Sequence, residues 1–139
     1  LNQVSTHIFA KQMQEAGHDL TPVQFAAMDA IASCPGIDQA GVAAKIAYDR
    51  ATIGTVLDKL DAKGLVTRKG SPRDRRAREM HLTEAGHNLY QAVTPLVQEI
   101  QTLMTTGLEP GERAEFLRLA AKLARAGNAL SRAPLIELE

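Results

Sequence analysis

The sequence predicts a mainly α-helical fold with one small β-hairpin, and three observations support this prediction. Apolar residues recur at helical spacing in several separate segments of the chain. Capping residues mark the starts of three of these segments. After position 64, short apolar runs flank a basic loop, which is typical of two strands joined by a turn. The 139 residues are enough for one domain, or for one core with a helical extension.

The first two helices are predicted from an apolar stripe and from a capping box. The stripe of the first helix, which ends at Gly17, contains Val4, Ile8, Phe9, Met13 and Ala16. At the start of the second helix, the Thr21 hydroxyl can accept the Gln24 amide while Gln24 reaches back, and Pro22 suits the first helical position. The buried face of the second helix is predicted to contain Phe25, Met28, Ile31 and Ala32.

A third and a fourth helix follow closely, each with an aspartate in position to cap it. Asp38 precedes a short helix that carries Val42 and Ile46. Asp49 precedes a longer helix that ends at Gly64. The apolar positions of this longer helix are Ile53, Val56, Leu57 and Leu60. Only about two residues separate the two helices, which is the connection of a helix-turn-helix whose second helix can enter a groove.

The hairpin is predicted from residues 65–67 and 80–82, which look like two short strands around the loop 70–76. Six basic side chains lie between Arg68 and Arg78, against the single acidic residue Asp74, although the net charge of the whole chain is zero. Positive charge that is concentrated in one segment of a neutral protein indicates a local binding site rather than a general contribution to solubility. A basic hairpin directly after a helix-turn-helix is a wing, so the predicted fold is a winged helix-turn-helix.

Two further helices complete the pattern. A helical run of about 24 residues reaches Gly107, and Pro95 inside it predicts a kink or bend. Its apolar positions are Leu89, Val93, Leu96, Val97, Ile100, Leu103 and Met104. The last helix follows Pro110, with an apolar face made of Phe116, Leu119, Ala120, Leu123 and Leu130. With the first helix, these carry more apolar surface than a small lobe can cover, which predicts a homodimer. Residues 1–20 and 84–139 are therefore expected to form a helical dimerisation region, and residues 21–83 a DNA-binding lobe.

Three stretches resemble the MarR family of multiple-antibiotic-resistance type regulators. They are L-T-P-V-Q-F, T-I-G-T-V-L-D-K-L-D-A-K-G-L-V and S-P-R-D-R-R-A-R-E-M-H-L-T-E-A-G, the last of which is the family's signature. The resemblance runs from Thr21 to about Gly86. One departure is Gly54-Thr55, where many relatives carry a longer polar or basic side chain. The resemblance implies a dimer whose recognition helices enter two major grooves of palindromic, double-stranded operator DNA while the wings reach toward minor grooves. It also implies a transcriptional regulator, expected to be a repressor relieved by a small aromatic or phenolic acid.

The candidate DNA-binding residues lie on the fourth helix and on the wing. Arg50, Thr52 and Thr55 are off the apolar stripe, and arginine can bind a guanine edge while threonine can contact a base or a thymine methyl. Alternatively, the threonines are plain helix surface and Arg50 pairs with Asp49. Arg73 and Arg75 at the wing tip suit a narrow minor groove with its enhanced negative potential. The alternative is a solvated charged loop. By resemblance, Asp74 braces a wing arginine, for which Arg76 is the candidate.

The effector pocket implied by the resemblance lies between the dimerisation helices and the DNA-binding lobe. Its candidate residues are His7, Met13, Met28 and Tyr48, because apolar walls with a few polar groups suit a small aromatic acid. The alternative is that these residues belong to the core, and this alternative is favoured for the two methionines.

Other chemistry is not expected. The four histidines lie on separate elements without a cysteine partner, so no metal site is predicted. Cys34 follows a helix, and a lone half-buried cysteine is usually inert packing. The absence of a nucleophile–base pair or a phosphate-binding glycine loop argues against an enzyme and a cofactor. A single cysteine, with no secretory signal or membrane span, fits the cytoplasm. Two alternatives stay open: a metal- or redox-responsive regulator, and a helical interaction dimer whose basic hairpin binds an acidic partner.

Overall fold

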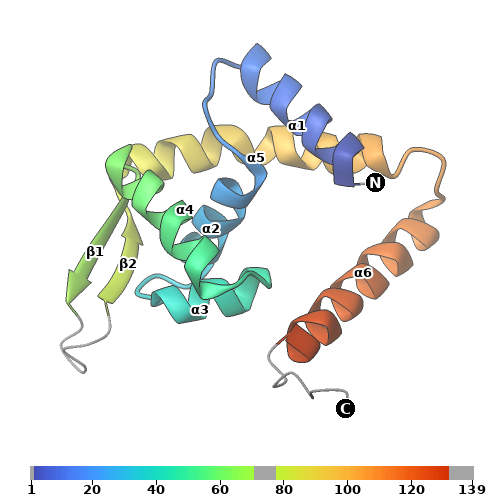
Figure 1. Cartoon of the computed structure of the whole chain (residues 1–139). Helices are drawn as coiled ribbons and strands as arrows, with labels where there is room; N and C mark the ends of the chain where they lie inside the picture. The colour runs from blue at the N-terminus through green and yellow to red at the C-terminus, as the bar shows by residue number, and fades with distance from the viewer. Residues whose placement is uncertain (1, 71–77, 132–139) are drawn as a thin grey trace. The chain divides into compact units, whose positions relative to one another are not determined.

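The computed structural model describes residues 2–70 and 78–131, without the side chains of residues 2, 124, 125 and 127–131. The elements are α1 (Asn2–Glu15), α2 (Pro22–Ser33), α3 (Gln39–Ile46), α4 (Arg50–Ala62), β1 (Val66–Gly70), β2 (Arg78–Leu82), α5 (Glu84–Met104) and α6 (Pro110–Ser131) (Figure 1). The chain divides into two compact units, residues 1–104 and 105–139. The first unit holds five helices and the hairpin, and the second unit holds α6. The mainly α-helical fold with one hairpin is therefore confirmed.

The three predicted helix caps are present. The Gln24 N–H donates to the Thr21 hydroxyl at 3.3 Å, and the Thr21 N–H donates to Gln24 Oε1 at 3.1 Å. At α3, the Gly41 N–H donates to the Asp38 carboxylate at 2.7 Å. At α4, the Thr52 N–H donates to the Asp49 carboxylate at 2.9 Å. Each cap satisfies a backbone donor that has no partner within its helix, so these starts are fixed by local chemistry.

One hydrophobic core joins the elements of the first unit. Its largest fully buried side chains are Met13, Met28, Ile31, Val42, Ile53, Leu57, Leu60, Val66, Met80 and Val93. All four apolar positions predicted for α4 are buried. The two ends of the predicted apolar stripe lie outside this core, since Val4 is 60% exposed and Ala16 is also exposed. Phe9 and Met13, which are one helical turn apart, are the buried residues of α1, and this helix packs on α5.

The hairpin is longer than predicted and is attached to the helix-turn-helix. Its strands are antiparallel, with Val66 opposite Leu82 and Gly70 opposite Arg78. Lys69 and Arg78, near the ends of the strands, are charged and exposed, so apolar alternation did not reveal these positions. Met80 also exchanges backbone hydrogen bonds with the segment before α3: the Gly36 N–H donates to its carbonyl at 2.9 Å, and its N–H donates to the Ile37 carbonyl at 3.0 Å. The hairpin is thereby held against the start of α3.

The long helix α5 begins in direct contact with the base of the hairpin. The Thr83 N–H donates to the Leu65 carbonyl at 3.0 Å, and the Thr83 hydroxyl donates to the Gly64 carbonyl at 2.6 Å. A Cβ at Gly86 would lie 2.1 Å from the Leu65 carbonyl oxygen, so only glycine fits there. This approach ties α5 to the segment that follows α4, through Gly64 and Leu65.

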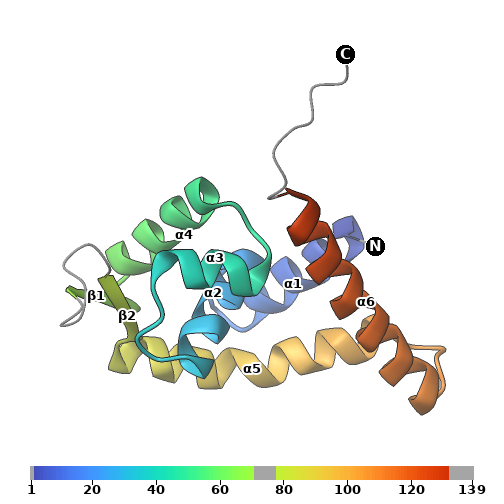
Figure 2. The same ribbon diagram turned by 90° about the horizontal axis from the view of Figure 1, so that it is seen from below.

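Pro95 does not break α5, which runs from Glu84 to Met104 and is gently curved along its length (Figure 2). A proline removes only one backbone hydrogen bond, and the ladder continues on both sides. The predicted kink or bend therefore takes the form of a gentle curve. None of the described helices is long and apolar enough to cross a membrane.

The second unit carries an apolar face on α6. The exposed fractions of Phe116, Leu117, Leu119 and Leu123 are 43%, 44%, 44% and 72%. Three of these were predicted for the apolar face of the last helix, and the side chain of Leu130 lies outside the described residues. An amphipathic helix of this kind requires another surface to cover its apolar side.

Candidate nucleic-acid interface

Helices α3 and α4 form a helix-turn-helix with a three-residue connection made of Ala47, Tyr48 and Asp49. Ala47 adopts a left-handed conformation with φ 59° and ψ 43°, which ends α3. The Tyr48 N–H donates to the Ala43 carbonyl at 3.0 Å, and Asp49 then caps α4. The connection is one residue longer than the sequence suggested, since the left-handed residue is outside both helices.

The three residues predicted to read DNA from α4 are all exposed. The four buried residues face the core, so Arg50, Thr52 and Thr55 lie on the remaining surface of the helix. The Thr55 hydroxyl makes only a long hydrogen bond of 3.4 Å to the Ala51 carbonyl. Because this contact is weak, Thr55 is available to a base edge. Among the described residues, no carboxylate forms an ion pair with Arg50.

Thr52 is exposed, and it also takes part in the cap of α4. Its hydroxyl donates to the Asp49 carboxylate at 2.5 Å, and its N–H donates to the other carboxylate oxygen. These two hydrogen bonds hold the pKa of Asp49 below its ordinary value, because both favour the charged form. The hydroxyl of Thr52 is thus occupied by the cap, and its methyl group remains the part that can contact a thymine methyl.

A hollow of about 320 Å³ lies between the helix-turn-helix and the hairpin. It is lined by Asp38, Gln39, Ala40, Arg50, Arg68, Arg78 and Met80. Arg68 donates to the Asp58 carboxylate at 2.6 Å, but its Nε is buried without a hydrogen-bond partner among the described residues. Three arginines, Arg50, Arg68 and Arg78, therefore line one hollow beside the start of α4, and arginine is a residue type suited to binding phosphate oxygens.

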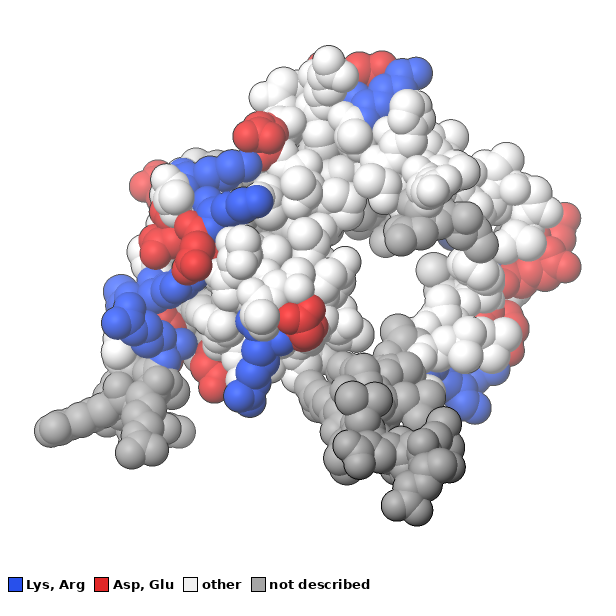
Figure 3. All heavy atoms as spheres, viewed as in Figure 1, with Lys and Arg blue, Asp and Glu red and all other residues white. Residues whose placement is uncertain are grey.

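The charges of this face alternate rather than forming one uniform patch. In Figure 3, lysine and arginine side chains lie at the hairpin with acidic side chains between them. Lys69 and Arg78 are exposed near the ends of the strands. The predicted wing residues Arg73, Asp74, Arg75 and Arg76 lie outside the described residues, so their roles stay predictions. Arg68 and Arg78 belong to the basic window of the sequence but were not predicted as site residues, and neither was Gln39.

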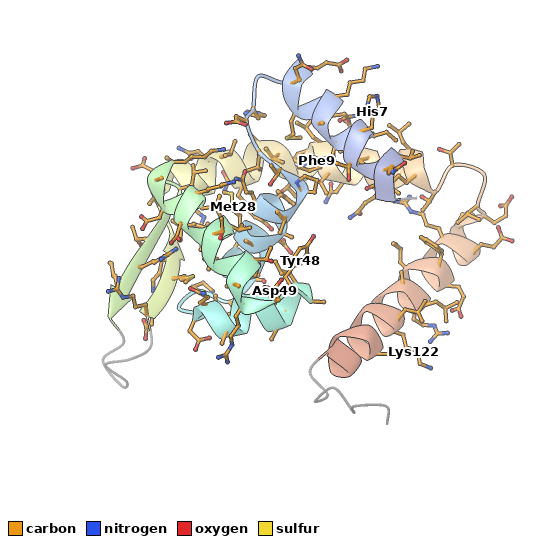
Figure 4. All side chains as sticks on the ribbon, viewed as in Figure 1. His7, Phe9, Met28, Tyr48, Asp49 and Lys122 are labelled. Carbon is orange, nitrogen blue, oxygen red and sulfur yellow. The ribbon has the colours of Figure 1, made fainter. Side chains whose placement is uncertain are left out.

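The four candidate effector residues come from three parts of the chain, namely α1, α2 and the turn between α3 and α4, and Figure 4 labels His7, Met28 and Tyr48. Met28 on α2 is fully buried, and Met13 on α1 is 2% exposed, so both are core residues. His7 is exposed on α1, and Tyr48 is 46% exposed in the turn between α3 and α4. Met13 also borders an open hollow of about 440 Å³ with Ala10, Gln14, Gly17, His18, Asp19 and Leu20.

A polar and aromatic contact links α2 with the long helix α5. The Tyr90 hydroxyl donates to the Asp29 carboxylate at 2.8 Å, and the rings of Tyr90 and Phe25 stack with centroids 5.7 Å apart. The hydrogen bond to Asp29 raises the pKa of Tyr90, since a phenolate there would face a carboxylate. This contact gives α5 a direct connection to the helix-turn-helix lobe.

Cys34 differs from its expected environment. It is exposed rather than half-buried, because it ends α2 and follows the last residues of that helix which face the core. The Lys45 ammonium donates to its sulfur at 3.4 Å. Among the described residues, no group of three or more histidine, cysteine, aspartate or glutamate side chains is arranged to hold a metal ion.

Comparison with known proteins gives a consistent result. The sequence pattern of the MarR family matches residues 18–77. The HTH-type transcriptional repressor NicR of Pseudomonas putida is 35% identical over 121 residues, which cover 87% of this chain and 75% of NicR. The structure is similar to that of Bordetella bronchiseptica BpsR, whose DNA binding is regulated by 6-hydroxynicotinic acid, with a TM-score of 0.81, 28% identity, and coverage of 88% and 86%. It is also similar to a mutant of E. coli MarR complexed with operator DNA, with a TM-score of 0.77, 25% identity, and the same coverage.

Proposed function

This chain belongs to the MarR family of DNA-binding transcriptional regulators, and on that premise we propose that it is a homodimeric repressor released from a palindromic operator by a small aromatic acid. The observation that carries the proposal is the outer surface of α4. There, Arg50 and Thr55 are exposed beside a hollow that gathers three arginines. Base contacts from such a helix discriminate between sequences, while arginines on phosphates fix its position.

The apolar face of α6 supports the homodimer. Phe116, Leu117, Leu119 and Leu123 are exposed, and apolar patches of this kind normally mark an interface. A twofold dimer presents two recognition helices, so its operator would consist of half-sites about 10 base pairs apart. We assign dimerisation to residues 1–20 and 84–139, as the sequence predicts.

The small aromatic acid is proposed from the Bordetella relative, whose DNA binding responds to 6-hydroxynicotinic acid. In this chain, the exposed His7 and Tyr48 are the polar candidates for its binding, and Met13 and Met28 are candidate walls only if the core opens. Release requires that the acid binds a conformation with misplaced recognition helices better than the DNA-competent one. A coupling of about 1–3 kcal/mol between the two sites is sufficient.

The test begins with an operator selected by the protein from a random-sequence duplex library. Benzoates, hydroxynicotinates, salicylates and cinnamates are then titrated into the protein–operator complex at fixed salt, with a thermal shift of the free protein as a second readout. We expect at least one acid both to stabilise the protein and to weaken operator binding. If no acid does either, the effector proposal fails, and DNA recognition is unaffected.

A redox-responsive regulator is the second candidate, because the exposed Cys34 lies beside Lys45. Peroxide added to the protein–operator complex distinguishes redox release from release by an aromatic acid. A chelator or zinc, added in the same way, tests the metal-responsive alternative. Loss of operator binding with peroxide but with none of the acids would favour the redox mechanism, and a Cys34→Ser variant would then be insensitive. The hypothesis of an interaction dimer that binds an acidic partner is set aside, since the family binds DNA.

A further inference from the structure

We propose that Gln39 is a positioning residue for DNA recognition, whose side chain occupies the space left by Gly54 on α4 and holds the start of this recognition helix in place. Gln39 is the first residue of α3, and Arg50 is the first residue of α4. The Gln39 Nε2 donates to the Arg50 backbone carbonyl at 3.2 Å. One side chain thus connects the first residues of the two helices of the helix-turn-helix.

Gly54 makes room for this connection. A Cβ at position 54 would lie 3.0 Å from Gln39 Nε2 and 3.9 Å from its Cδ, with no other atom within 4 Å. Gly54 has an ordinary helical conformation, so the backbone does not require glycine there. Glycine inside a helix is less favourable than alanine. The missing side chain is therefore explained by the space that the Gln39 amide needs.

The connection acts on residues that face DNA. Asp49 binds the Thr52 N–H and hydroxyl at the start of α4, and Gln39 binds the Arg50 carbonyl. Both Gln39 and Arg50 also line the hollow that contains Arg68 and Arg78. The helix start is thus held by two side chains from outside the helix, one through a backbone donor and one through an acceptor.

Such a contact is expected to affect specificity more than general affinity. Hydrogen bonds to base edges require donor–acceptor distances within a few tenths of an ångström, so a small shift of α4 weakens the contacts of Arg50 and Thr55. Contacts to phosphates through flexible side chains tolerate a shift more easily and act on all sequences alike. Loss of the Gln39 contact should therefore reduce the preference for the operator over random DNA. The inference rests on the proposed recognition of an operator by α4.

The experiment uses the Gly54→Ala, Gln39→Ala and double variants of the full chain, with Gly111→Ala as the matched control. Gly111 lies in α6 with nothing within 4 Å of an added Cβ, so its substitution changes a helical glycine without displacing a neighbour. Affinities for the selected operator, for random duplex, and for operators with single base-pair changes are measured at one salt concentration. Thermal unfolding is recorded for every variant.

We expect Gly54→Ala to lower the operator preference by about tenfold, the loss typical of one weakened base contact. The melting temperature should stay equal or rise, because the Gln39 side chain can swing away and alanine favours the helix. Gln39→Ala should give the same loss, and adding Gly54→Ala to it should change nothing more. The loss should be spread over several base pairs. Because Gly111 lies in the proposed dimerisation region, light scattering checks that Gly111→Ala keeps the wild-type mass, and its operator preference should then equal that of the wild type.

Three results would overturn the proposal. One is an unchanged operator preference in Gln39→Ala, which tests the role even if Gly54→Ala does not fold. Another is an effect of Gly54→Ala that is equally large with and without Gln39. The third is a loss confined to a single base pair, which would make Gln39 a direct DNA contact. A wild-type protein that prefers no duplex sequence would instead contradict the proposed function.

Discussion

Helices α4 and α6 have similar amphipathic patterns, but they differ in how much of their apolar side chains is buried. The four apolar residues of α4 are at most 7% exposed, because α2, α3 and β1 pack around this helix. The large apolar residues of α6 whose side chains are described are 43–72% exposed. The comparison teaches that the first unit buries the apolar face of α4 in its own core, whereas the second unit does not bury the apolar face of α6 by itself.

Removing a leucine from each helix tests this difference most strongly. Leu57→Ala should lower the free energy of unfolding by about 2–5 kcal/mol, because Leu57 is fully buried and a cavity remains. Leu123→Ala, at a side chain that is 72% exposed, should change the fold of the lobe little but weaken the dimer. Urea unfolding and light scattering measure the two effects. Equal losses of stability in dilute protein would contradict the comparison.

Gly86→Ala tests how tightly the lobe is joined to α5. The added Cβ would meet the Leu65 carbonyl oxygen at 2.1 Å, and a backbone atom cannot move away as a side chain can. We expect a loss of about 1–3 kcal/mol in the free energy of unfolding, as for other overpacked sites. Chemical denaturation measures it, with Gly111→Ala as the control. An unchanged denaturation midpoint would show that α5 does not need this close approach.

Thr55→Ala changes the predicted DNA-binding surface of α4 without altering the hydrophobic core or the proposed dimer interface. Thr55 is exposed on α4, so the variant should keep its stability and its molecular mass. Discrimination between the operator and random DNA should fall by about 1 kcal/mol, since a groove contact is lost and phosphate contacts remain. Anisotropy titrations on both duplexes provide the measurement. The same loss on both would mean that Thr55 reads no base.

The smallest expected effect concerns the link between the lobe and α5. The bond to Asp29 raises the folded-state pKa of Tyr90 above 10.0, so its stabilisation is complete below that pH and is lost as the pH rises through the folded value. Tyr90→Phe keeps the ring beside Phe25 but removes the hydrogen bond, at a cost below about 1 kcal/mol. Stability curves from pH 7 to 11 should converge for the two proteins at high pH. Parallel curves would contradict this assignment.

Local chemistry explains what could be predicted from the sequence. The caps at Thr21, Asp38 and Asp49 act within three residues, so their patterns identified the helix starts. The apolar stripe of α4 could be predicted too, because its residues are only a few positions apart in the sequence. The strand ends were not, because Lys69 and Arg78 are charged and give no apolar alternation.

Contacts between distant segments explain what could not be predicted. Gln39 reaches Arg50 from another helix, and Gly86 meets Leu65 from another element. The signal for each was a glycine inside a predicted helix, but a glycine does not name its neighbour. The exposure of Val4 could not be predicted either, since periodicity shows that a face is apolar and not whether anything covers it.

An anisotropy titration of the wild-type protein tests the central claim most directly. In one series, the affinities for the selected operator and for a random duplex of equal length are measured at the same salt concentration. In a second series, the operator concentration is well above the dissociation constant, so that the end point gives the number of chains bound per operator. The account predicts at least a roughly thousandfold preference for the operator. It also predicts saturation at two chains per operator, as a twofold dimer requires. Equal affinity for the two duplexes, or saturation at one chain, would contradict it.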